Sequence, residues 1–303
     1  MTRAVWQQRF LITGGTGLIG SAIRSKISEA GGRATVLSRS QTRSENPSDV
    51  FINSLDAIHR QQHFDVVINL AGAPIAGKRW NAAYRQTLLN SRITTTEALL
   101  SLFKRLEHGP RRLISASAIG YYGDRGDQIL TEDSAPGSNF AAKLCQRWEA
   151  VALKAQSHRI PVTVARLAVV MSKQGGSWSE FKRPLLAKVS PLFGAGEQWF
   201  SWVYIDDLVN ALAFSIEREL DGAVLVSAPE ALTNRELALT LAEQSGAWLK
   251  PQIPACVLRA MLGPMADELL LCSQRVKPER LIQAGFTFSR TRFAECATSL
   301  LRS

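Results

Sequence analysis

The 303-residue chain lacks the features that mark several classes of protein. Its four cysteines are scattered and form no Cys-x-x-Cys pair, which is typical of free thiols in a reducing compartment. Its four histidines are scattered too, and nothing near His59 and His63 completes a metal site. No apolar run reaches the roughly 18 residues of a membrane span, and residues 1–8 contain no signal-peptide core. We therefore expect a cytoplasmic protein with no metal and no membrane contact.

The formal net charge of +10 is compatible with nucleic-acid binding, but the basic residues are spread along the chain. There is no dense Lys/Arg tract, helix-turn-helix pattern or zinc pattern, so we expect no nucleic-acid partner. A cofactor that carries several phosphates, or an anionic substrate, accounts for part of the charge more economically. The 46% of hydrophobic residues is ample for a large core.

One short stretch, residues 10–20, organises the rest of the chain. An apolar run from Phe10 to Ile12 predicts a buried strand, and residues 18–30 have the apolar spacing of a helix. Between them the glycines fall as Gly14-x-x-Gly17-x-x-Gly20. Gly14 allows a tight turn, Gly17 lets a pyrophosphate approach the backbone, and Gly20 lets the helix pack close to the strand. The stretch predicts a dinucleotide-binding turn in which the helix N-terminus faces the phosphates.

The end of the next strand, Ala34 to Leu37, carries the signal for the type of dinucleotide. A fold that prefers NAD places an acidic residue about 20 residues after the glycine turn, where it holds the ribose 2′-hydroxyl. This chain has Ser38 and Arg39 there, with Arg43 close by. A guanidinium forms a bidentate pair with a 2′-phosphate, so we predict NADP(H). The alternative is that Arg39 is an ordinary surface arginine.

Strands and helices then alternate as far as residue 171, which predicts an α/β fold with a doubly wound parallel sheet. Strands are expected at 65–70, 111–118 and 162–171, and helices at 80–106 and 140–156. We predict a dinucleotide-binding domain over residues 1–171, whose sheet can recruit later strands. A smaller C-terminal α/β substrate region follows over residues 172–303.

Two features of the chain each allow two interpretations. Arg92, in the helix expected at 80–106, is either a cofactor or substrate contact or part of a solvated salt bridge. The glycine-rich and aromatic loops after Ser172 either line a pocket or cover a small second core.

Several motifs resemble the extended short-chain dehydrogenase/reductases, the nucleotide-sugar epimerase superfamily. They are Gly14-x-x-Gly17-x-x-Gly20, Asn69-Leu70-Ala71-Gly72, Ser115-Ala116-Ser117, Tyr121-Tyr122-Gly123 and Trp202-Val203-Tyr204-Ile205-Asp206-Asp207-Leu208. More narrowly, the chain resembles the atypical epimerase family protein group, which has its own C-terminal domain. That likeness rests on Gly72-Ala73-Pro74-Ile75-Ala76, Ser91-Arg92, Cys145-x-x-Trp148-Glu149, Gly194-x-Gly196-x-Gln198 and Gln274-Arg275-Val276-x-Pro278. It implies a Rossmann-type fold and a family-specific helical domain at about 250–299.

The resemblance also implies how NADP(H) would be held. Thr16, Gly17, Leu18 and Ile19 would cradle the pyrophosphate, Ser38 and Arg39 would hold the 2′-phosphate, and Leu70, Ala71 and Gly72 would lie along the cofactor. Arg92 would reach it from the helix, and Val170 would sit near the nicotinamide. Superfamily relatives often form homodimers through the helices expected at 80–106 and 140–156.

The superfamily's reaction uses a tyrosine that transfers a proton and a lysine four residues later that favours the phenolate. That pair does not match here, because Asn139 stands four residues before Lys143. Ser117 matches the serine that orients the substrate, and Tyr122 matches a second tyrosine beside the substrate. We predict Ser117 and Tyr122 as catalytic residues.

Three hypotheses for function follow. The first is an NADP-dependent oxidoreductase or epimerase that acts on a sugar-like or carbonyl small molecule. The second is a catalytically impaired NADP-binding protein that serves as a sensor or binds a partner. The third, suggested by the net charge alone, is a nucleic-acid binder on a Rossmann scaffold.

Overall fold

The computed structural model describes residues 3–39 and 47–301. Its centre is a seven-stranded, wholly parallel sheet with the strand order β3-β2-β1-β4-β5-β7-β13. The strands are β1 (Arg9–Thr13), β2 (Arg33–Leu37), β3 (Asp49–Ile52), β4 (Val66–Asn69), β5 (Arg112–Ala118), β7 (Val162–Leu167) and β13 (Gly222–Val226). The strand order runs outward in both directions from β1, so the predicted doubly wound α/β fold is confirmed.

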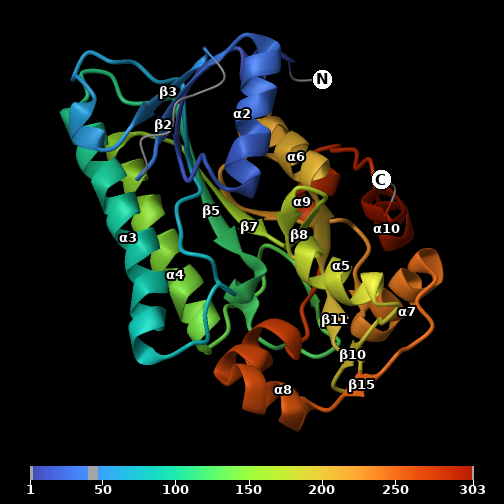
Figure 1. The fold of residues 1–303 in the computed structure, drawn as a ribbon. Helices are drawn as coiled ribbons and strands as arrows, with labels where there is room; N and C mark the ends of the chain where they lie inside the picture. Colours follow the sequence, from blue (N-terminus) through green and yellow to red (C-terminus); the bar gives the residue numbers. More distant parts are fainter. Residues whose placement is uncertain (1–2, 40–46, 302–303) are drawn as a thin grey trace.

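Helices cover both faces of this sheet (Figure 1). Helices α3 (Ala82–Arg105) and α4 (Phe140–Leu153) lie on one face, and α2 (Leu18–Ala30) and α6 (Ile205–Glu217) lie on the other. Alternate residues of β1 divide between the two cores. Leu11 packs in the cluster that includes Leu99 of α3, whereas Phe10 and Ile12 pack in the larger cluster with Ile23 of α2.

The remaining elements lie mostly toward the carboxyl ends of the strands (Figure 1). The short strands are β6 (Ile129–Leu130), β8 (Val169–Ser172), β9 (Gly175–Gly176), β10 (Leu192–Phe193), β11 (Trp199–Phe200), β12 (Trp202–Tyr204), β14 (Leu232–Thr233), β15 (Gln252–Ile253) and β16 (Arg275–Val276). The helices are α1 (Arg3–Trp6), α5 (Trp178–Leu186), α7 (Asn234–Ser245), α8 (Ala255–Leu262), α9 (Glu279–Gln283) and α10 (Phe293–Leu301). Short 3-10 turns occur at η1 (Leu55–Ala57), η2 (Ile119–Tyr122) and η3 (Lys154–His158), and η4 (Ala266–Leu270) is a π-helix.

The strand expected at 162–171 is in fact two strands. The first, β7, pairs with β5 and β13 in the central sheet, whereas β8 pairs with β12 and β9 in a separate small sheet. The change of sheet occurs at Ala168, whose backbone N–H donates to Val226, and at Val169, whose N–H donates to Ser201. The central sheet takes its last strand, β13, from beyond residue 171, and the division into domains stays a prediction.

No helix in residues 3–39 and 47–301 is both long and apolar enough to cross a membrane.

Candidate cofactor and active site

The three glycines of the Gly14-x-x-Gly17-x-x-Gly20 motif have different steric surroundings. Gly14 has φ +70°, and a Cβ there would lie 2.6 Å from the carbonyl oxygen of Leu70. A Cβ on Gly20 would lie 2.5 Å from the Gly14 oxygen and from the Gly15 Cα. Gly17 has φ −77°, which any residue adopts, and a Cβ there would meet only the Gly14 oxygen, at 3.4 Å. The fold therefore requires glycine at Gly14 and Gly20, whereas the open side of Gly17 leaves room for a ligand.

The N-terminus of α2 presents backbone donors with no protein cap. Gly17 is the N-cap residue, and no side chain accepts a hydrogen bond there. A groove of about 520 Å³ begins at Thr16, Gly17 and Leu18 and continues along α2. The uncapped N–H groups of this helix terminus favour negative charge, which fits the pyrophosphate of a dinucleotide.

The residues predicted to hold the 2′-phosphate lie beside this turn. Leu37 ends β2 opposite Thr13 of β1, and the next two residues, Ser38 and Arg39, continue from that strand end. Ser38 is buried and its N–H donates to Ile52, whereas Arg39 is exposed. Arg43 lies outside the described residues. A guanidinium at the end of β2 matches the place where the ribose of a dinucleotide is recognised.

A pocket of about 560 Å³ at the carboxyl end of β2 was not predicted from the sequence. Its lining comes from the ends of β2 and β3, from η1 and from α3, and consists of Leu37, Asn53, Ser54, Leu55, Asp56, Thr94, Thr95, Ala98, Ser101, Leu102 and Arg105. The strand β3 that positions Asn53 was itself missed, because the four-residue run at 49–52 has no clear alternation of apolar and polar residues. The pocket is lined by a mixture of apolar, amide and hydroxyl groups, which suits a purine base.

A buried polar cluster fixes the loop that follows β4. The Thr13 hydroxyl donates to the Asn69 side chain at 2.7 Å, and the Asn69 amide donates to the hydroxyls of Thr96 and Ser115. The N–H of Leu70 donates to the Thr13 carbonyl. The segment Leu70, Ala71 and Gly72 is thereby held against the glycine turn, as expected for a backbone that lies along a cofactor.

Arg92 of α3 contacts that loop, and its contacts favour one of the two interpretations made from the sequence. A Cβ on Gly72 would lie 2.8 Å from the guanidinium carbon of Arg92, and the guanidinium donates to the carbonyls of Leu88 and Ala73. Its burial lowers the pKa of Arg92, and in the described part of the chain no salt bridge joins Arg92 to a carboxylate. A half-buried cation without a counter-ion at the cleft favours the ligand contact over the solvated salt bridge.

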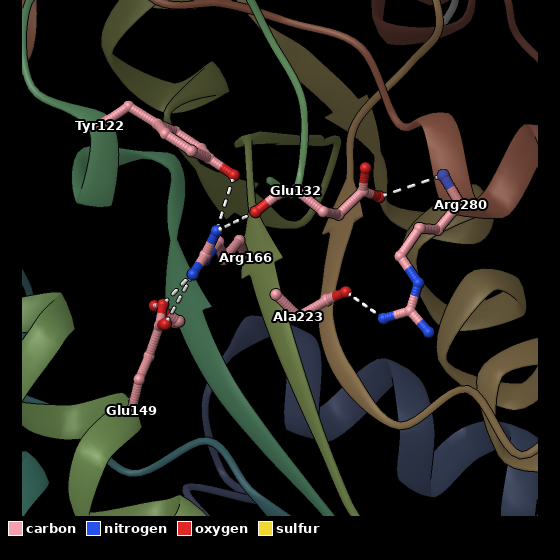
Figure 2. A network of polar contacts seen from close by, with 7 residues as sticks. Tyr122, Glu132, Glu149, Arg166, Ala223 and Arg280 are labelled. Atoms are coloured by element: carbon pink, nitrogen blue, oxygen red, sulfur yellow. Dashed lines mark hydrogen bonds and ion pairs between the residues drawn. The ribbon is translucent and has the colours of Figure 1, made fainter. Parts of the chain in front are cut away.

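The two residues predicted as catalytic lie in a buried charged cluster, much of which Figure 2 shows. Arg166 of β7 forms two hydrogen bonds to the carboxylate of Glu149 on α4, at 3.0 and 2.9 Å. It also donates to the Tyr122 hydroxyl and to the carbonyl of Glu132, both at 2.9 Å. The Ser117 hydroxyl donates to Glu149 at 2.5 Å. Ser117 is 3% exposed and Tyr122 is 0% exposed, and both hydroxyls form hydrogen bonds to buried protein side chains.

The electrostatics of the cluster oppose proton transfer by Tyr122. Burial raises the pKa of Tyr122 to about 12, although the Arg166 cation acts in the opposite direction. Burial alone would lower the pKa of Arg166, but the Glu149 carboxylate raises it well above its usual range. A general acid works best with a pKa near the working pH. The catalytic role of Ser117 and Tyr122 stays a prediction, and their surroundings argue against it.

The start of α4, where the superfamily carries its tyrosine and lysine, does not hold this pair. Asn139 caps the helix by accepting from the Ala142 N–H, and Lys143 is exposed. The two positions four residues apart that face η2 are Ala141 and Cys145; a Cβ on Gly120 would lie 3.3 Å from the Ala141 Cβ and 4.0 Å from the Cys145 Sγ. Burial raises the pKa of the Cys145 thiol to about 11, so it stays neutral.

The C-terminal segment also reaches the start of α4, which the sequence did not reveal. The Glu268 carboxylate of η4 accepts from the Ala141 N–H at 2.7 Å. Further along, the Gln274 amide donates to the Gly123 carbonyl. Val170, predicted near the nicotinamide, lies in β8 opposite Val203 of β12. The preceding strand of the chain, β7, ends at Leu167.

Two models of protein families match this chain. Residues 10–226 match the model of the NAD dependent epimerase/dehydratase family. The chain belongs to this family. Residues 253–300 match a second model, described only as a domain of unknown function, and this part contains η4 and Glu268. The predicted resemblance to the epimerase superfamily, with a distinct C-terminal domain, is confirmed.

Relatives of similar length extend the likeness over nearly the whole chain. An epimerase family protein of Staphylococcus haemolyticus is 35% identical over 286 residues, covering 93% of this chain and 95% of its own. One from Mycobacterium bovis is 34% identical over 288 residues and covers 94% of each chain. Among solved structures, the human epimerase family protein SDR39U1 (isoform 2) with NADPH superposes with a TM-score of 0.87 at 28% identity, over 96% of this chain and 98% of that one.

Proposed function

We propose that this protein binds NADP(H) and is an NADP-dependent oxidoreductase or epimerase that acts on a sugar-like or carbonyl substrate. The observation that carries the binding is the β1–α2 turn, where Gly17 is open on its outer side and the α2 N-terminus has no protein cap. The human relative whose solved structure contains NADPH supports the same cofactor.

The choice of NADP(H) over NAD(H) rests on Arg39. An exposed guanidinium after β2 attracts a 2′-phosphate, and no acidic side chain takes the place that would hold a 2′-hydroxyl. Titration of the protein with NADPH and with NADH, followed by nicotinamide fluorescence, tests this directly. We expect tighter binding of NADPH by at least tenfold, and equal affinities would refute the argument from Arg39.

A second candidate function is favoured by the burial of Ser117 and Tyr122 and by the lack of a Tyr-x-x-x-Lys pair on α4. In this case the protein binds NADP(H) without turnover and acts as a sensor or partner-binding protein. A screen of keto-sugars and small carbonyls for NADPH oxidation separates the two. Turnover supports the enzyme, and NADPH binding without turnover on any of them supports the sensor.

A further inference from the structure

Tyr121, rather than Tyr122, is the tyrosine of η2 that keeps part of its side chain exposed. Both follow the carboxyl end of β5, which lies between β4 and β7 at the centre of the sheet. Tyr122 is 0% exposed, whereas Tyr121 is only partly buried. In the described part of the chain, the Tyr121 hydroxyl makes no hydrogen bond, so it is available to a ligand.

The Tyr121 ring rests on a fixed cation. The guanidinium carbon of Arg166 lies 3.5 Å from the centre of the Tyr121 ring, and Tyr122 meets the same ring edge-on at 5.2 Å. Glu149 holds Arg166 through two hydrogen bonds and the Glu132 carbonyl holds it through a third, as Figure 2 shows. The cation is therefore held in a fixed position against the face of the phenol.

The backbone around Tyr121 lies against the first turns of α4. The preceding residue, Gly120, lies against Ala141 and Cys145, and the Tyr121 carbonyl accepts from the Gly137 N–H. Ala141 has no proton to donate, and the Cys145 side chain is buried. A tyrosine paired with a cation is the chemistry that the missing pair would provide.

We propose that Tyr121 is the proton donor of this protein, with Arg166 as its positioning cation, in place of a Tyr-x-x-x-Lys pair. This inference rests on the proposed NADP(H)-dependent function. Ser117, Glu149 and Tyr122 then have a positioning role, because they hold Arg166 beneath the phenol.

The proton transfer balances with the groups named. When bound, NADPH would supply the hydride that the carbonyl carbon of the substrate receives. The Tyr121 O–H bond breaks, and its proton passes to the carbonyl oxygen, which becomes the hydroxyl of the product. The phenolate left on Tyr121 lies over the Arg166 guanidinium and regains its proton from water.

Chemical labelling tests the position of Tyr121 without any activity. The protein is treated with N-acetylimidazole, which acetylates accessible phenols, with and without saturating NADPH, and the labelled peptides are identified by mass spectrometry. We expect Tyr121 to be labelled in the free protein and protected at least fivefold by NADPH, and Tyr122 to stay unlabelled. The Tyr121→Phe variant should lose the protected label, and the Tyr122→Phe variant should keep it.

The outcomes separate this inference from the function on which it rests. Nicotinamide fluorescence in the same samples reports whether NADPH is bound. Failure of NADPH to bind refutes the proposed function, and this inference with it. Bound NADPH without protection of Tyr121, or a Tyr121 that resists labelling in the free protein, refutes only the inference.

Turnover supplies the second measurement. Because a positioned general acid contributes roughly 100- to 10,000-fold, Tyr121→Phe should lower kcat for carbonyl reduction at least 100-fold. The phenylalanine ring keeps its stacking on Arg166, so NADPH affinity and thermal stability should stay close to those of the wild type. A kcat within threefold of the wild type would overturn the assignment.

Discussion

Substituting the glycines of the β1–α2 turn one at a time separates the needs of the fold from the needs of the ligand. In Gly17→Ala the new methyl meets only the Gly14 oxygen at 3.4 Å, and φ −77° suits alanine. In Gly20→Ala the new methyl lies 2.5 Å from two backbone atoms of the turn. The same chemical change should therefore have opposite consequences at two positions three residues apart.

The expected magnitudes follow from these contacts. For Gly17→Ala, loss of a favoured N-cap residue opposes the lower entropy of the unfolded chain, and each effect is about 0.5–1 kcal/mol, so stability changes little. Its methyl occupies the side from which a pyrophosphate approaches, and overpacking of about 1–3 kcal/mol corresponds to roughly 5- to 150-fold weaker NADPH binding. For Gly20→Ala the backbone must move, at a cost of about 3 kcal/mol or more.

Two assays on the same preparations check the pair. Thermal unfolding should show Gly17→Ala within about 2 °C of the wild type and Gly20→Ala lower by roughly 6–12 °C, from about 2–4 °C per kcal/mol. NADPH titration by fluorescence should show the loss of affinity in Gly17→Ala. Wild-type affinity in a stable Gly17→Ala protein would refute the placement of the pyrophosphate, and an unperturbed Gly20→Ala protein would refute the close packing of α2 on the turn.

Three further predictions concern the cofactor preference, the buried cluster and the C-terminal segment. Arg39→Asp should weaken NADPH binding at least tenfold and leave NADH binding equal or tighter, measured by fluorescence titration; a parallel loss for both would contradict a 2′-phosphate contact. Because the pKa of Tyr122 is raised to about 12 in the folded protein from 10.0, the folded state holds this proton longer, so stability should fall as pH rises from 10 to 12, by up to about 3 kcal/mol. Urea unfolding across that range should give a shallower decline for Tyr122→Phe, and equal slopes would count against the shift. Glu268→Ala should cost about 0.5–2 kcal/mol, because the Ala141 N–H loses its acceptor, whereas Asp267→Ala, which removes an exposed ion pair with Arg259, should cost under about 1 kcal/mol.

The sequence by itself determined the glycine turn and the strand and helix that flank it. Strand, turn and helix between Arg9 and Ala30 depend on local apolar spacing and on glycines with local steric reasons, which can be read without the rest of the chain. The capping box of α7 is a similar case: Thr233 and Glu236 form both of its hydrogen bonds. The strand at 49–52 was missed because it is short and its pattern is weak.

The tertiary structure alone decided which side chains around η2 are buried and which one stays partly exposed. Ser117, Tyr121 and Tyr122 are neighbours in sequence, but their directions depend on Glu149 and Arg166, which arrive from α4 and β7 and are far along the chain. Local propensity cannot tell a tyrosine that is bonded inside the core from one that covers the core. Likewise, the contact between Glu268 and the first turn of α4 joins residues 127 positions apart, so only the folded chain could place that carboxylate at the helix that lacks the superfamily's tyrosine.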